Sequence, residues 1–147
     1  EKIWELKIEN DARVLIVDDM AVVSCYDGYI YALDLKEEKR MWEFKAESRV
    51  YSITTKDNIV IVGCSYNEDL GYAPVYALNL KTGKLIWKFK ANYSVSNISI
   101  NNDFLILSTE DLSSMESYVY AVNLHTANKI WEFKAESTVF TIISEDN

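Results

Sequence analysis

Apolar and polar residues alternate along most of this chain, and the apolar positions are rich in Val, Ile, Tyr, Phe and Trp. Alternation with a period of two is typical of half-buried β-strands, whereas an amphipathic helix repeats its apolar positions every ~3.6 residues. Turn-forming pairs such as Asp18-Asp19 and Asp27-Gly28 separate the strand-like segments. The pattern therefore predicts an all-β protein in which short turns join antiparallel strands.

The strand-like segments recur in tandem, and two landmarks mark each period. The first landmark is a Trp in a short strand, which recurs at intervals of 38, 45 and 44 residues, at Trp4, Trp42, Trp87 and Trp131. The second is a Tyr-Ala segment that lies eleven residues before each of the last three tryptophans: Tyr31-Ala32-Leu33-Asp34-Leu35, Tyr76-Ala77-Leu78-Asn79-Leu80 and Tyr120-Ala121-Val122-Asn123-Leu124. Two landmarks that keep the same spacing indicate a structural repeat.

Each period contains four predicted strands. The three complete units cover residues 13–46, 49–91 and 94–135, and they are flanked by a lone fourth strand at 2–8 and a lone first strand at 138–144. Tandem four-stranded units of about 40 to 45 residues are typical of β-propeller blades. The sequence therefore predicts an all-β partial β-propeller, with about three four-stranded antiparallel blades plus one orphan strand at each end.

Family signatures narrow the kind of propeller. WD blades carry Gly-His and Trp-Asp pairs and kelch blades carry paired glycines, and none of these pairs occurs in the sequence. The chain instead resembles the PQQ-like (quinoprotein-type) repeat, whose consensus is Tyr-Ala-Leu-Asp, two residues, Thr-Gly, three residues and Trp. Residues 76–87 are the nearest copy, whereas Glu37-Glu38 and Thr126-Ala127 replace Thr-Gly in the other two blades.

The resemblance implies a packing role for the landmark residues. In proteins of the PQQ-like family, the Trp of the outer strand packs between adjacent blades against a small Ala and the Gly turn. The resemblance therefore assigns inter-blade packing to Trp42, Trp87, Trp131, Ala32, Ala77 and Ala121, and Trp4 and Gly83 join them as structural residues of the repeat.

Three blades are fewer than the roughly four to eight that close a propeller. Uncovered blade faces and orphan strands would expose apolar surface and strand edges, so we expect the isolated monomer to be unstable. The preferred interpretation is a segment of a larger propeller. The alternative is self-association, in which copies of the chain complete one another.

Charge and hydropathy restrict the partners. The net charge is -8 and the pI is about 4.7, which argues against nucleic acid because phosphate binding needs clustered Lys and Arg. No apolar run approaches the length of a membrane span. We therefore expect a protein or peptide partner, which includes further blades or a second copy, and neither a nucleic acid nor a membrane-spanning segment.

The cysteines and the single histidine offer little chemistry. Cys25 and Cys64 take the same position in two blades, beyond the ~7 Å reach of a disulfide, and are predicted to be small core residues. Free thiols favour a reducing compartment, whereas the family resemblance also allows a periplasmic or extracellular one. His125 is the one histidine, which excludes most triads and His-based zinc sites. The sequence predicts no catalytic, cofactor or metal site.

The loops between second and third strands differ among the blades. This loop is only Asp27-Gly28 in the first blade, but it spans 67–72 in the second and 110–117 in the third. In an antiparallel meander these loops share one face with the inter-blade connections. The candidate binding residues are Glu68, Asp69, Tyr72, Glu110, Asp111, Met115 and Glu116. They fit a basic peptide or a loosely held hard cation, and the alternative interpretation is solubility and drift in loop length.

The preferred functional interpretation is a non-enzymatic propeller scaffold or binding module that mediates protein-protein interaction. It rests on the loops elaborated at one face and on the lack of a nucleophile-base pair in the sequence. The first alternative is a fragment of a PQQ-dependent dehydrogenase, for which the resemblance implies a quinone and calcium along the central axis and an adjacent Cys pair, which this chain lacks. The second alternative is a self-assembling structural arc that uses exposed strand edges.

Overall fold

The computed structural model describes Lys7, residues 11–111 and residues 113–139, and these contain twelve strands in three four-stranded antiparallel sheets. The first sheet contains β1 (Ala12–Val17), β2 (Met20–Cys25), β3 (Tyr29–Asp34) and β4 (Lys39–Lys45). The second contains β5 (Val50–Lys56), β6 (Ile59–Cys64), β7 (Ala73–Asn79) and β8 (Leu85–Ala91). The third contains β9 (Ser94–Asn101), β10 (Phe104–Glu110), β11 (Ser117–Asn123) and β12 (Lys129–Ala135). The predicted all-β fold is confirmed.

Two predicted elements fall largely outside the described residues. These are the orphan strands at 2–8 and 138–144, and Trp4 lies outside as well. In the described part of the chain, no helix has the length and apolar character needed to cross a membrane.

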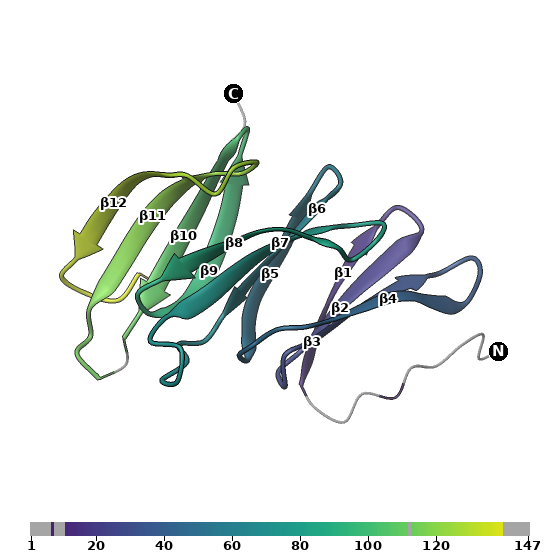
Figure 1. Ribbon diagram of the computed structural model, residues 1–147, viewed down its shortest axis with the longest axis horizontal. Helices are drawn as coiled ribbons and strands as arrows, with labels where there is room; N and C mark the ends of the chain where they lie inside the picture. Colours follow the sequence, from purple (N-terminus) through teal and green to yellow (C-terminus); the bar gives the residue numbers. More distant parts are fainter. Residues whose placement is uncertain (1–6, 8–10, 112, 140–147) are drawn as a thin grey trace.

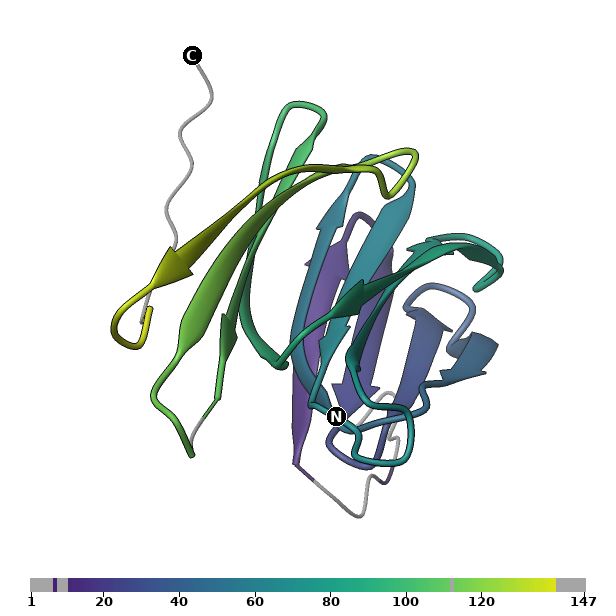
Figure 2. The ribbon, with the colours of Figure 1, turned by 60° about the vertical axis from the view of Figure 1, so that its left-hand side comes forward.

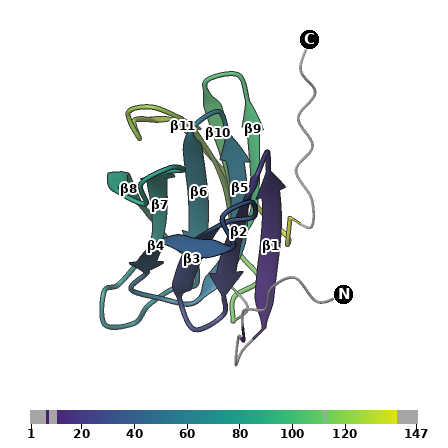
Figure 3. The ribbon, with the colours of Figure 1, turned by 90° about the vertical axis from the view of Figure 1, so that its right-hand side faces the viewer.

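The three sheets stack against one another like propeller blades (Figure 1). Their first strands, β1, β5 and β9, lie along one side of the stack, and β4 and β8 lie on the other side (Figure 3). The turned view shows that each sheet twists strongly between its first and fourth strands (Figure 2). The second sheet is therefore covered on both faces, whereas the first and third sheets each have one face that no other described sheet covers.

The Asp or Asn of the Tyr-Ala landmark builds the turn between third and fourth strands. Oδ1 of Asp34 accepts hydrogen bonds from the backbone N–H groups of Lys36 and Glu37, at 2.9 and 2.8 Å. Asn79 and Asn123 accept the equivalent pairs in the other two blades. A short side chain that bonds to the backbone two and three residues on favours a tight turn. This explains why the landmark keeps Asp or Asn in every blade.

Most of the core lies between the sheets, and a smaller buried cluster of Ala21, Val23, Cys25 and Leu33 lies within the first sheet. Buried side chains join the first sheet to the second: Val22, Ile30, Ala32, Trp42, Val60, Val62, Tyr76 and Leu78. A second cluster joins the second sheet to the third: Ile61, Val75, Ala77, Trp87, Leu105, Leu107, Tyr120 and Val122. Because both of their faces are covered, β6 and β7 are buried almost throughout.

Trp42 and Trp87 join the successive blades. Nε1 of Trp42 donates a hydrogen bond to the carbonyl of Leu80 in the next blade at 2.8 Å, and the side chain is 8% exposed. The indole ring lies against Gly83, where φ is +68° and a Cβ would come within 2.6 Å of Cδ2. Gly83 therefore serves both the turn and the ring. Trp87 donates equally to the carbonyl of Leu124 at 2.8 Å and is 9% exposed.

The landmark alanines are buried, and each lies opposite the Trp of its own blade in the strand register: Ala32 opposite Trp42, Ala77 opposite Trp87 and Ala121 opposite Trp131. Trp131 differs from its two equivalents because it is 47% exposed. No further sheet lies on β12 within the described residues. The inter-blade packing assigned to Trp131 by the family resemblance is therefore not seen in this part of the chain.

Candidate functional site

The loops after β6 and β10 close in the same way. In the first loop, the N–H of Asn67 donates to the carbonyl of Tyr72, and the N–H of Gly71 donates back to the carbonyl of Asn67, at 3.1 and 2.8 Å. In the second loop, the N–H of Asp111 donates to the carbonyl of Glu116 at 2.9 Å. The two longer loops are thus fixed by their own backbone hydrogen bonds.

Side chains hold both loops in place. The carboxylate of Asp111 accepts hydrogen bonds from the Ser114 hydroxyl at 2.6 Å and from the Ser113 hydroxyl at 2.7 Å. These bonds lower the pKa of Asp111 to about 2, so the carboxylate is ionised at neutral pH. In the other loop, Nδ2 of Asn67 donates to the carbonyl of Glu47 at 2.9 Å, which ties that loop to the connection between the first two blades.

A groove of about 450 Å³ lies between these loops, and we call it the acidic groove. It is lined by Tyr66, Glu68, Tyr93, Ser94, Glu110, Asp111 and Ser113. The lining comes from two blades, which meet where the N–H of Tyr66 donates to Oγ of Ser94 at 2.9 Å. None of the described lining residues is basic. The groove therefore presents carboxylates and tyrosine side chains to a ligand.

The structure gathers only some of the predicted binding residues at this groove. Three of them line it: Glu68, Glu110 and Asp111. Glu116 lies beside the groove, because its carboxylate accepts a hydrogen bond from the hydroxyl of the lining residue Tyr93 at 3.3 Å. The same carboxylate forms an ion pair with Lys134 on β12 at 2.6 Å.

Three predicted binding residues, Asp69, Tyr72 and Met115, do not line the acidic groove. Tyr72 faces the fourth strand of its own blade, since its hydroxyl accepts a hydrogen bond from Nζ of Lys88 at 2.9 Å and its ring centre lies 4.7 Å from Nζ of Lys90. Met115 is exposed on its loop.

Three lining residues that the sequence did not predict, Tyr66, Tyr93 and Ser94, are brought to the groove by the stacking of the blades. Tyr66 and Ser94 also line a second groove, of about 500 Å³, whose lining includes Lys45 and Arg49 from the first two blades. The loop face therefore changes from acidic between the second and third blades to mixed charge between the first and second.

Glu47 forms the main polar network between the first two blades. Its carboxylate accepts a hydrogen bond from the hydroxyl of Tyr76 at 2.7 Å and forms an ion pair with Lys88. Lys88 and then Tyr76 lower the pKa of Glu47 below its ordinary value of 4.5. The network thus connects the inter-blade connection to β7 and β8.

The Glu47 network predicts a pH dependence of stability. Because the pKa of Glu47 is lower in the folded chain than in the unfolded chain, its contribution is present above pH 4.5 and is lost as the pH falls through the folded pKa. We expect Glu47→Gln to lose less stability than the parent chain on acidification below pH 4.5, as measured by urea unfolding at several pH values. Equal acid sensitivity of the two chains would contradict this expectation.

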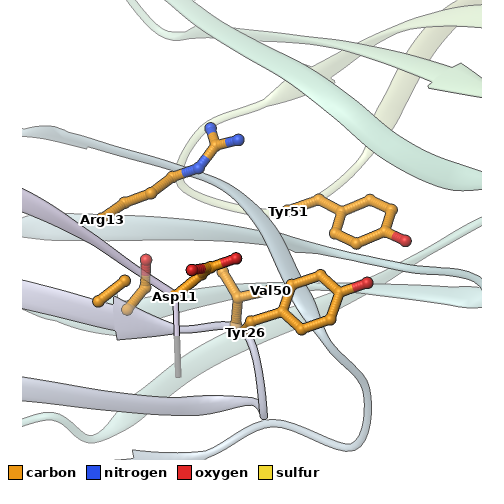
Figure 4. A pocket seen from close by; sticks show the side chains of 7 residues that line it. Asp11, Arg13, Tyr26, Val50 and Tyr51 are labelled. Carbon is orange, nitrogen blue, oxygen red and sulfur yellow. The ribbon is translucent and has the colours of Figure 1, made fainter. Parts of the chain in front are cut away.

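A third pocket, of about 410 Å³, opens between the first and second blades, and its lining includes Asp11, Arg13, Tyr26 and Tyr51 (Figure 4). The rings of Tyr26 and Tyr51 stack with centroids 5.9 Å apart. The lining also includes Ser24, whose buried hydroxyl has no hydrogen-bond partner among the described residues. The repeat gives no signal for this pocket, because Tyr26 and Tyr51 take different positions in their blades.

The reactive residue types lie apart from the grooves. Cys25 and Cys64 are buried and unpaired, and burial raises the pKa of the Cys64 thiol to about 12. His125 lies in the turn between β11 and β12, with Nε2 3.0 Å from Oδ1 of Asp103. Over the described ranges, no group of three or more His, Cys, Asp or Glu residues could hold a metal ion. The chemistry offered by the acidic groove is that of binding through charge and aromatic surface.

Comparisons of sequence give one family and one partial relative. A family model described as outer membrane protein assembly factor BamB matches residues 26–146. An uncharacterized protein of Methanocaldococcus jannaschii is 36% identical over 60 residues, which is 41% of this chain and 6% of that protein. The chain therefore spans a small part of the length of this relative.

Comparisons of structure show the propeller fold. The computationally designed protein Ika4 has a TM-score of 0.82 at 16% identity, over 100% of this chain and 88% of that chain. A europium-containing methanol dehydrogenase has a TM-score of 0.72 at 16% identity, over 84% of this chain and 24% of the enzyme. BamB from Moraxella catarrhalis has a TM-score of 0.67 at 17% identity, over 88% of this chain and 39% of that protein. At these identities the likeness concerns the fold alone, which is that of β-propeller blades.

Proposed function

The chain belongs to the PQQ-like repeat family whose model is described as outer membrane protein assembly factor BamB, and from this premise we propose that it is a non-enzymatic β-propeller module that binds a protein or peptide partner. We propose further that its three blades are a segment of a larger propeller. The description of the family model names an assembly factor, which supports a binding role.

The acidic groove is the observation that carries the proposal. The carboxylates of Glu68, Glu110 and Asp111 lie in one groove with the side chains of Tyr66 and Tyr93. Lys and Arg side chains bind both kinds of group, through charge-assisted hydrogen bonds to carboxylates and cation-π contacts with aromatic rings. The groove therefore fits a basic segment of a partner protein.

Rigid sheets and a favourable overall charge support the same role. Binding residues are often carried by loops that a rigid scaffold positions, and both loops at this groove are closed by backbone hydrogen bonds. The net charge of -8 attracts basic partners and raises their association rate at low salt. The net charge thus favours the approach of a basic segment over that of an acidic one, and the carboxylates of the groove favour a basic segment once it is bound.

The non-enzymatic part of the proposal is supported by the placement of the reactive groups. The one histidine, His125, lies in a third-to-fourth-strand turn and contacts Asp103. The groove itself is lined by carboxylates, phenols and serine hydroxyls. A nucleophile activated by a histidine needs that histidine within hydrogen-bond reach, and no histidine is among the described residues that line the groove.

Exposed apolar residues support the segment part of the proposal. Val14 and Ile16 are exposed on β1, and Trp131 and Phe133 are exposed on β12. Contiguous apolar surface of this kind marks an interaction surface more often than a free surface. Both outer sheets of the stack therefore suit contact with further blades.

A peptide titration tests the binding proposal. The probe is a fluorescein-labelled peptide of alternating Arg and Tyr residues, and the reference peptide carries Glu in place of Arg. We expect the double variant Glu68→Gln/Glu110→Gln to bind the Arg peptide about 10-fold more weakly than the parent chain, because two charge-assisted contacts are lost. Fluorescence anisotropy measures both dissociation constants.

A matched variant controls for the change in net charge. Glu37→Gln/Asp57→Asn also removes two negative charges. Glu37 lies in the turn between β3 and β4 and Asp57 in the turn between β5 and β6, and both turns are at the opposite ends of the blades from the acidic groove. Its affinity should stay close to that of the parent chain. Equal weakening by both double variants would mean that the peptide senses only net charge, and the proposed site would be wrong.

A further inference from the structure

The exposed aromatic side chains of β12 form a face on which no other described sheet packs, and this face resembles the surfaces by which β4 and β8 contact the next blade. Trp131 is 47% exposed and Phe133 is 62% exposed, whereas Trp42 and Trp87 at the equivalent positions are buried by the next blade. We call Trp131, Phe133 and Ala135, which alternate along one side of β12, the β12 face. Its chemistry can be compared directly with the two junctions inside the stack.

The junction after β4 combines an indole, an aromatic edge contact and a charge. Trp42 docks on Gly83, and Phe44 meets Tyr76 edge to face with ring centroids 5.2 Å apart. Glu47 accepts a hydrogen bond from the hydroxyl of Tyr76. Glu47 also pairs with Lys88, the residue that follows Trp87 on β8.

The junction after β8 has other residues at the two positions that Glu47 and Lys88 occupy in the junction after β4. Phe89 still meets Tyr120 edge to face, with centroids 5.8 Å apart. Asn92 takes the place of Glu47, and its backbone N–H donates to the hydroxyl of Tyr120 at 3.4 Å. In the third blade, Glu132 takes the position that Lys88 has in the second blade. The junction after β8 therefore combines the neutral Asn92 with Glu132, where the junction after β4 combines Glu47 with Lys88.

The β12 face belongs to the first kind of junction by its sequence. Residues 131–137 repeat residues 42–48 residue for residue, including Glu136 in the place of Glu47. Residues 87–93 differ from both segments at three positions, where they carry Lys88, Asn92 and Tyr93. The β12 face and Glu136 therefore present the same indole, aromatic ring and carboxylate that the second blade receives from β4 and Glu47.

We propose that the β12 face binds a four-stranded blade of the β5–β8 type, which offers a Gly at the position of Gly83, a Tyr at the position of Tyr76 and a Lys at the position of Lys88. This inference rests on the part of the proposed function that places the three blades in a larger propeller. It goes further because it states which kind of blade docks on the β12 face.

A second copy of this chain is a poorer occupant. A head-to-tail contact would bring the β12 face onto the first blade, where Glu38 takes the position of Gly83 and Glu43 takes the position of Lys88. Trp131 would then meet a side chain in place of a Gly, and Glu136 would face Glu43 with like charge. Both differences disfavour the contact.

An extended chain tests the inference. Because residues 134–147 are similar in sequence to residues 45–58, a copy of residues 59–91 is added after Asn147 to complete a hybrid blade of the β5–β8 type. The matched control adds the same copy with Glu in place of the residues copied from Gly83 and Lys88. Both chains have the same length and differ only at the positions that the inference names.

The first readout is the urea midpoint. The second is the hydrogen-exchange rate of the Trp131 indole N–H, measured by NMR with the indole N–H groups of Trp42 and Trp87 as internal references. We expect the unmodified copy to raise the midpoint by about 1 M and to slow the exchange of Trp131 to the rate of Trp42, and the control copy to do neither. Equal effects of the two copies would overturn the choice of blade type, and no effect of either would overturn the docking of a blade.

The parent chain provides a further test against self-association. If its Trp131 indole becomes protected as the protein concentration rises, a second copy occupies the β12 face and the inference is wrong. The peptide titration at the acidic groove does not involve Trp131. Failure of blade docking and failure of partner binding can therefore be told apart.

Discussion

Replacing Trp42 with alanine is expected to lower the free energy of unfolding by about 3–5 kcal/mol, as measured by urea denaturation. The side chain is almost fully buried between the first two blades, and its indole N–H bonds to the carbonyl of Leu80. Alanine would leave a cavity beside Gly83 and an unpaired carbonyl in the junction. If the variant does not fold, Trp42→Phe is the milder substitution, because it keeps an aromatic ring in the junction and removes the hydrogen bond with only part of the indole surface.

Trp131→Ala is the matched control for this prediction. Trp131 takes the same position in its blade, but nearly half of its surface is exposed, so the loss should be no more than about 1 kcal/mol. Equal losses at Trp42 and Trp131 would contradict the account in which Trp42 stabilises the chain by docking on the next blade.

Replacing Gly83 with valine is expected to lower the free energy of unfolding by about 3 kcal/mol. A residue with a Cβ is strained at a φ of +68°, the Cβ itself would lie 2.6 Å from Cδ2 of Trp42, and a branched side chain would add further contacts with the indole ring. Gly83→Ala should have a smaller effect of about 1–2 kcal/mol. The third blade shows that one Cβ can be accommodated, because Ala127 takes the equivalent position at a φ of 61° while Trp87 stays buried.

Glu38→Val measures the strain that a β-branched side chain adds at such a turn beyond that of the unbranched Glu38. Glu38 has a φ of 52° at the equivalent turn of the first blade, so valine there is strained, but no described tryptophan docks on that turn. Its loss should be clearly smaller than that of Gly83→Val in the same urea assay. A loss as large as that at Gly83 would show that backbone strain alone explains the effect and that contact with Trp42 does not.

Sequence periodicity was sufficient for the fold because the repeated residues have local tasks. Asp34 and Asn79 each fix a turn within their own blade, so their spacing reports the strand order without knowledge of the rest of the chain. Trp42 and Ala32 lie opposite one another in the register of one sheet. Such short-range rules leave a clear trace in sequence, and four strands for each period follow from them.

The acidic groove was only partly predictable, because its lining depends on how two blades stack. Glu68, Glu110 and Asp111 could be found as acidic residues of long loops. Tyr66 and Tyr93 could not, since one follows a second strand and the other lies in an inter-blade connection. Sequence position alone did not indicate that they would converge.

The direction of a loop side chain was also beyond sequence reasoning. Tyr72 and Glu116 take equivalent places in their loops, and both contact a Lys on the fourth strand of their own blade: Lys88 and Lys134 respectively. Their partners lie 16 and 18 residues away in sequence. Only the pairing of third and fourth strands brings each pair together.

Mapping the bound peptide on the chain tests the central claim most directly. In a titration of the ¹⁵N-labelled chain with the Arg-Tyr peptide, the account predicts that backbone amide shifts change at Tyr66, Glu68, Tyr93 and Glu110, around the acidic groove between the second and third blades. Changes confined to the third-to-fourth-strand turns, or none at peptide concentrations that saturate the anisotropy signal, would contradict a binding site in the acidic groove.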